Sequence, residues 1–226
     1  MTSSPRTQTQ PVAPRRYGVV VAIIVICCLI ELALSASDLG VIEYPSLRRI
    51  AYEYAGFWPG LLGNWVPNYA AQPFTMFATY GVLHGGPGHL LVNMITLWSL
   101  GRAVTDRVGT RGFLQLYLCA MVGGAMGFGL LSSSLTPMVG ASGALFGLAG
   151  GYLAWTYVDL YALQDKLWPV VRAVLFLVAL NLILWWAMDG LLAWETHLGG
   201  FVIGWVVALL IDPIPRDPDA ADPDQL

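Results

Sequence analysis

The chain has 226 residues, of which 57% are hydrophobic and only 11% are charged, and its mean hydropathy is +0.64. Soluble domains are about one quarter charged, so this composition excludes an ordinary water-soluble domain and a disordered chain. The net charge of −3 at pH 7 and the lack of a basic cluster in the sequence argue against nucleic-acid binding. The composition is therefore that of a membrane protein.

Six apolar stretches are each long enough to cross a bilayer as a helix, which takes about 20 residues. They are 17–35, 83–104, 113–133, 141–159, 168–188 and 193–211. We predict an all-α polytopic membrane protein whose core, 17–211, is a bundle of six transmembrane helices. A polar, arginine-containing flank precedes the first stretch, as it does the apolar core of a signal peptide. The stretch is longer than the usual signal core of about 7–15 apolar residues, which favours a retained anchor.

The basic residues lie on one side of the predicted topology. With the N-terminus in the cytoplasm, Arg48 and Arg49 are the only two of the 11 lysine and arginine residues that lie outside. This distribution follows the positive-inside rule. It predicts that two cytoplasmic tails, 1–16 and the acidic, proline-rich 212–226, flank the core. The size and topology favour the inner membrane of a bacterium.

The segment 36–75 is too polar to cross the membrane, yet it is rich in tyrosine, tryptophan and phenylalanine. Aromatic residues at this density favour the headgroup level of a bilayer. We predict an external loop whose short helices lie in the membrane interface. An ordinary extracellular loop is the alternative.

All three histidines of the chain, His84, His89 and His197, lie at or within the outer halves of predicted spans. Polar residues at membrane depth are costly and are therefore candidates for function. His89 and Asn93 are four residues apart, so they share one helix face and direct two donors to one place. Polar contacts between helices and a zinc site are the alternatives, but no cysteine or carboxylate set accompanies the histidines. We expect no metal and no cofactor.

A serine between glycines opens the fourth apolar stretch, where Ser142 lies between Gly140 and Gly143. The N-terminus of a helix offers free backbone N–H groups that favour negative charge, which suits an oxyanion. The motif alone is weak evidence, because serine is common at helix N-termini. Gly147 follows Gly143 at i+4, and such small residues permit close contact with another helix.

The last apolar stretch carries a second glycine face, because Gly200 and Gly204 follow His197 at i+3 and i+7. If the two glycine faces meet, the hydroxyl of Ser142 and the imidazole of His197 come together near the outer ends of their helices. A serine beside a neutral imidazole is the smallest nucleophile–base pair.

The imidazole needs a group that orients it. Glu195 lies about 200° around the helix from His197 and points away. We therefore predict a dyad without a carboxylate, in which stacking on Phe146 orients the ring. Ordinary core packing is the alternative role for Phe146.

These residues resemble the motifs of the rhomboid intramembrane serine proteases, and the resemblance covers the six-span core. The motifs His-x4-His-x3-Asn, Gly-x-Ser-Gly and His-x2-Gly-x3-Gly occur in the family's order, beginning at His84, Gly140 and His197. The resemblance implies that Ser142 is the nucleophile and His197 the general base. It implies an oxyanion hole made by His89, Asn93 and the backbone N–H of Ser142. It implies supporting roles for His84, Gly140, Gly143, Phe146, Gly200 and Gly204.

The implied activity is hydrolysis of peptide bonds in the transmembrane segments of membrane proteins, with those substrates and membrane lipids as partners. The fifth span and the loop 185–195 resemble a mobile gate and cap over the site. The family commonly has tyrosine where this chain has Phe146, and a Trp-Arg pair where it has Thr75 and Met76. The alternative is a catalytically inactive rhomboid-like protein that binds membrane clients. A transporter or channel is disfavoured, because the inner halves of the spans are apolar.

Overall fold

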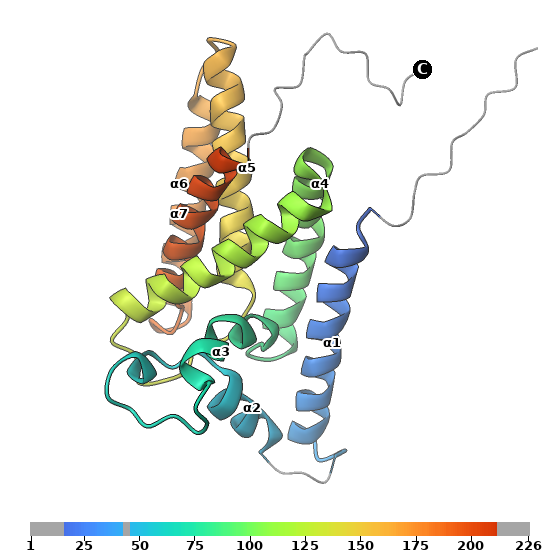
Figure 1. Ribbon diagram of the computed structural model, residues 1–226, viewed down its shortest axis with the longest axis vertical. Helices are drawn as coiled ribbons and strands as arrows, with labels where there is room; N and C mark the ends of the chain where they lie inside the picture. Colours follow the sequence, from blue (N-terminus) through green and yellow to red (C-terminus); the bar gives the residue numbers. More distant parts are fainter. Residues whose placement is uncertain (1–15, 43–45, 212–226) are drawn as a thin grey trace, which may run out of the picture.

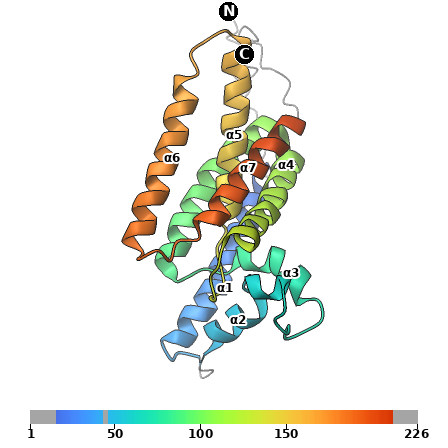
Figure 2. The same cartoon turned by 90° about the vertical axis from the view of Figure 1, so that its left-hand side faces the viewer.

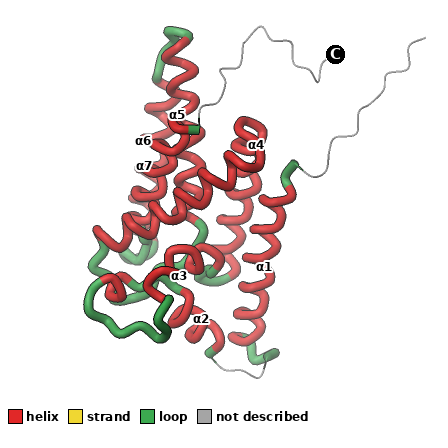
Figure 3. Tube along the Cα trace, in the orientation of Figure 1, coloured by secondary structure: helices red, strands yellow, loops and turns green. Residues whose placement is uncertain are grey.

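The computed structural model describes residues 16–42 and 46–211, and within them the chain is helical, with no sheet (Figure 3). The elements are α1 (Gly18–Asp38), α2 (Leu47–Ala55), η1 (Pro59–Leu62), α3 (Gln72–Thr79), η2 (Tyr80–Val82), α4 (Pro87–Leu131), α5 (Ser142–Ala162), α6 (Trp168–Ala187) and α7 (Trp194–Leu210). Apart from Arg16, the two predicted tails, 1–16 and 212–226, lie outside the described residues.

Three of the described helices, α1, α4 and α6, are long and apolar enough to cross a membrane, and α7 is a shorter apolar helix. α4 has 45 residues and is interrupted at Gly109, whose φ of 71° and ψ of 176° are not helical. Glycine adopts this conformation without a steric penalty. The stretches predicted separately as 83–104 and 113–133 are thus two arms of one kinked element. Figure 1 shows the first arm running beside α1 and the second returning across the molecule.

α5 and α7 are in direct backbone contact at the centre of the molecule. A Cβ atom at Gly200 would overlap the carbonyl oxygen of Gly143, and one at Gly204 would overlap that of Gly147. Such close approach maximises dispersion contact, which drives helix association where lipid is as apolar as the side chains. The two glycine faces therefore meet, and they bring the N-termini of α5 and α7 together.

α6 lies at the edge of the helix bundle, as Figure 2 shows. All of its residues are described, and Val170 is the only buried one. The rest of the helix leaves large apolar side chains exposed, as expected for a surface that faces lipid.

Residues 46–82, named the external segment here after the predicted loop 36–75, fold into α2, η1, α3 and η2 at one end of the bundle (Figure 1). Phe57, which is fully buried, exchanges two backbone hydrogen bonds of 3.0 and 2.9 Å with Met138. Met138 belongs to the loop between α4 and α5, four residues before Ser142. The external segment thus holds the loop that leads into α5.

Candidate active site

Ser142 and His197 are brought together by the contact between α5 and α7. Ser142 is the first residue of α5, and His197 lies in the first turn of α7. The Oγ atom of Ser142 is 2.9 Å from Nε2 of His197, although 55 residues separate them in the chain. A hydroxyl within hydrogen-bond distance of an imidazole can be activated as a nucleophile.

The turn before Ser142 requires glycine at position 140. Gly140 has a φ of 126°, and a Cβ atom there would lie 2.8 Å from Cε1 of His89. Its N–H donates to the carbonyl oxygen of Tyr80 at 3.0 Å. Gly140 therefore lets the chain pass close to His89 on its way into α5.

Phe146 stacks on the imidazole of His197, with ring centroids 4.1 Å apart and planes 9° from parallel. Phe146 lies one turn along α5 from Ser142, so the same helix face carries the hydroxyl and the ring. The structure therefore contains the predicted stacking of Phe146 on the imidazole of His197.

Asn181 of α6 is a site residue that the sequence reasoning missed. Its Oδ1 atom is 2.6 Å from Nδ1 of His197. The expectation that only an apolar contact orients the imidazole is therefore wrong. Both ring nitrogens have partners, Ser142 and Asn181, and Glu195 is neither of them. The signal was available, because Asn181 is a lone amide within an apolar span and polar residues at membrane depth are functional candidates.

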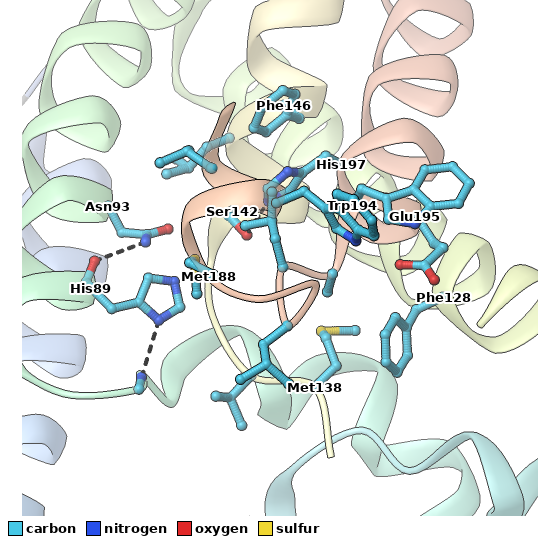
Figure 4. A pocket seen from close by; sticks show the side chains of 18 of the residues that line it. His89, Asn93, Phe128, Met138, Ser142, Phe146, Met188, Trp194, Glu195 and His197 are labelled. Carbon is cyan, nitrogen blue, oxygen red and sulfur yellow. Dashed lines mark hydrogen bonds between the residues drawn. The ribbon is translucent and has the colours of Figure 1, made fainter. Parts of the chain in front are cut away.

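His89 and Asn93 face the same cavity from α4 (Figure 4). Nδ1 of His89 accepts a hydrogen bond of 3.1 Å from the backbone N–H of Gly85. In a neutral imidazole the other nitrogen then carries the hydrogen, so Nε2 is a donor. Asn93 donates from Nδ2 to the carbonyl oxygen of His89 at 2.9 Å, while its Oδ1 is buried without a partner in the described residues.

His84 lies behind His89 and does not line the cavity. Its ring packs edge-to-face on that of His89, with centroids 5.3 Å apart. Its carbonyl oxygen accepts hydrogen bonds from Tyr52 at 2.6 Å and from Arg48 at 2.9 Å. The backbone of His84 is thereby held to the external segment.

The cavity that contains these groups has a volume of about 900 Å³. Apolar side chains from α4, α5 and α6 and from the loop before α7 form most of its lining. Within the described residues, no group of three or more histidine, cysteine, aspartate or glutamate side chains could hold a metal ion. The polar groups of the cavity are a paired hydroxyl and imidazole with further donors nearby, a set suited to acyl transfer.

Comparison with known proteins agrees with the motifs. Residues 71–213 match the family model of the rhomboid domain. The chain is 39% identical over 134 residues to RHOMBOID-like protein 4 of Arabidopsis thaliana, covering 58% of this chain and 33% of that protein. It is 34% identical over 127 residues to Rhomboid protease GluP of Bacillus subtilis (strain 168), covering 56% of this chain and 24% of that protein.

A third relative is Rhomboid protein 1, mitochondrial, of Saccharomyces cerevisiae, with 30% identity over 139 residues, 55% of this chain and 39% of that protein. The matched regions thus span 24% to 39% of the length of these three relatives. The family model covers more than half of this chain, and three of the described helices are apolar enough to cross a membrane. The chain therefore belongs to the rhomboid family of integral membrane proteins.

Proposed function

We propose that this protein is an intramembrane serine endopeptidase in which Ser142 is the nucleophile and His197 the general base. The 2.9 Å contact between the Ser142 hydroxyl and the His197 imidazole carries the proposal. His197 takes the hydroxyl proton as Oγ attacks the carbonyl carbon, and it then gives the proton to the leaving amine. Water, activated by the same imidazole, releases the acyl group from Ser142.

The proposed oxyanion hole consists of Nε2–H of His89, the amide of Asn93 and the backbone N–H of Ser142. The hydrogen bond from Gly85 supports the role of His89, because it leaves the hydrogen on Nε2. The N–H of Ser142 is in the first turn of α5, where backbone donors have no partner within the helix.

The proposed membrane arrangement has six spans, which are α1, the two arms of α4, α5, α6 and α7. Arg107 supports the orientation, because it forms two hydrogen bonds of 2.8 and 2.9 Å with Asp159, at the end of α5 opposite Ser142. By the positive-inside rule this end faces the cytoplasm, together with both tails. The cavity then opens to the outer face, and the external segment lies in the outer interface. We place the protein in a bacterial inner membrane.

The proposed substrates are transmembrane segments of other membrane proteins, which reach the site from the surrounding lipid. A helix buries its peptide bonds in its own hydrogen bonds, so a substrate must unwind locally before Ser142 can attack. α6 and the loop before α7 line the cavity and form its proposed gate and cap.

The test compares full-length variants in detergent, using a fluorophosphonate probe and a model single-span substrate. We expect the wild type to be labelled and to cleave, and Ser142→Ala and His197→Ala to do neither. Ser133→Ala is the matched control, because Ser133 lines the same cavity and has no role in the proposed chemistry. A wild type that shows a cooperative thermal unfolding transition but is neither labelled nor active would overturn the proposal and would support the client-binding alternative.

A further inference from the structure

Asn181 joins α6 to the imidazole of His197 through a defined chain of hydrogen bonds. Its Nδ2 donates to the backbone carbonyl oxygen of Leu177 at 3.0 Å, and its Oδ1 lies 2.6 Å from Nδ1 of His197. A carbonyl oxygen can only accept, so the amide nitrogen must be the atom that faces Leu177. The orientation of the Asn181 side chain is thereby set by the backbone of its own helix.

This orientation determines which nitrogen of His197 carries the hydrogen. Oδ1 of Asn181 can only accept, so Nδ1 of the neutral ring must donate. Nε2 then has a free lone pair, and it lies 2.9 Å from the hydroxyl of Ser142. The hydroxyl is therefore the donor in that contact, as attack by its oxygen requires. In the opposite tautomer Nε2 would carry the hydrogen and could not take the serine proton.

We propose that Asn181 is a positioning residue on α6 that favours the Nδ1–H tautomer of His197, so that the contact with α6 makes the imidazole a better base. The proposal rests on the proposed function of Ser142 and His197. α6 contributes little else to the core, because Val170 is its only buried residue. The stacked ring of Phe146 fixes the plane of the imidazole but has no acceptor that could select a tautomer.

Two substitutions separate the hydrogen bond from packing. Asn181→Leu keeps the branched shape of the side chain and removes the acceptor, whereas Asn181→Asp keeps an acceptor and adds a negative charge. Leu182→Ala is the control, because Leu182 is the next residue of α6, is 62% exposed and does not line the cavity. Each variant is made in the full chain and checked by thermal unfolding in detergent.

The first measurement is the tautomer itself, read from nitrogen-15 chemical shifts of labelled histidine, with His197 assigned from the spectrum of His197→Gln. We expect the Nδ1–H form in the wild type, in Leu182→Ala and in Asn181→Asp, and a mixture with the Nε2–H form in Asn181→Leu. An unchanged tautomer in Asn181→Leu would overturn the proposal. This measurement does not depend on activity, so it decides the role of Asn181 even if a fluorophosphonate fails to label Ser142 and the proposed function is wrong.

The second measurement is the rate of fluorophosphonate labelling, in which Oγ of Ser142 displaces fluoride from phosphorus and His197 takes the proton. We expect Asn181→Leu to react about tenfold more slowly, a change of ~1.4 kcal/mol in activation free energy. In Asn181→Asp the carboxylate stabilises the protonated imidazole of His197. The pH at which labelling reaches half its maximal rate should therefore rise. If Asn181→Leu does not fold, an unshifted pH profile in Asn181→Asp overturns the proposal.

Discussion

The guanidinium of Arg48 lies 2.7 Å from the carboxylate of Glu31, and the pair joins the external segment to α1. Glu31 is only 2% exposed and lies in α1, a helix long and apolar enough to cross a membrane. The hydrogen bond to Glu31 raises the pKa of Arg48 above its usual value, with smaller contributions from Tyr52 and Asp38. Because Arg48 also donates to the carbonyl oxygen of His84, one side chain connects α1, α2 and the segment that leads into α4.

Arg48→Ala should lower the unfolding free energy by about 3–5 kcal/mol, because it leaves Glu31 as a buried charge without its partner. The measurement is thermal or denaturant unfolding in detergent. Arg49→Ala is the matched control, since Arg49 is an exposed neighbour, and it should change stability by less than about 0.5 kcal/mol. The double variant Glu31→Gln/Arg48→Ala should recover part of the loss. Equal stability of Arg48→Ala and Arg49→Ala would show that the pair does not hold the external segment.

Phe146→Leu should slow fluorophosphonate labelling of Ser142 by about twofold to tenfold, because an aromatic pair contributes about 0.5–1.5 kcal/mol beyond its buried area. Phe146→Tyr keeps the stacked ring and should react at a rate close to that of the wild type. Phe176→Leu removes a ring from α6 that is 64% exposed, and it serves as the control. A wild-type rate in Phe146→Leu would mean that stacking does not orient His197.

Gly200→Ala should force α5 and α7 apart, because the new methyl group would overlap the carbonyl oxygen of Gly143. Overpacking of this kind costs about 1–3 kcal/mol of stability. Labelling of Ser142 should fall as well, since the separation of α5 and α7 sets the distance from Ser142 to His197. Gly18→Ala is the control, because a Cβ atom there has no neighbour within 4 Å. If Gly200→Ala keeps both stability and labelling, the close helix contact is not required.

Asn93→Ala should lower kcat for a model substrate by about 10²–10³-fold, the usual effect of losing one oxyanion donor. KM should change little, because the lost contact forms only in the transition state. Thr96→Val is the control, since Thr96 lines the cavity and its hydroxyl donates to the carbonyl oxygen of Val92 in the same helix. A raised KM with an unchanged kcat would instead assign Asn93 to substrate binding.

Much of the helical architecture could be predicted from the sequence, because the length of an apolar run and the spacing along a helix are local properties. The predicted stretches 168–188 and 193–211 correspond to α6 at Trp168–Ala187 and α7 at Trp194–Leu210. The glycine spacing at i+3, i+4 and i+7 likewise indicated which faces of α5 and α7 meet. The continuity of α4 through the kink at Gly109 was not predicted, because a glycine in sequence does not reveal its φ.

The sequence by itself determined the membrane class of this protein, the helix faces that carry Ser142, Phe146 and His197, and the family motifs. Only the tertiary structure decided which polar groups far apart in the chain touch. Asn181 reaches His197 because of how α6 is rotated and translated against α7, and Arg48 reaches Glu31 because α2 packs across α1. Such contacts depend on the placement of whole helices, which neither residue spacing nor hydropathy encodes.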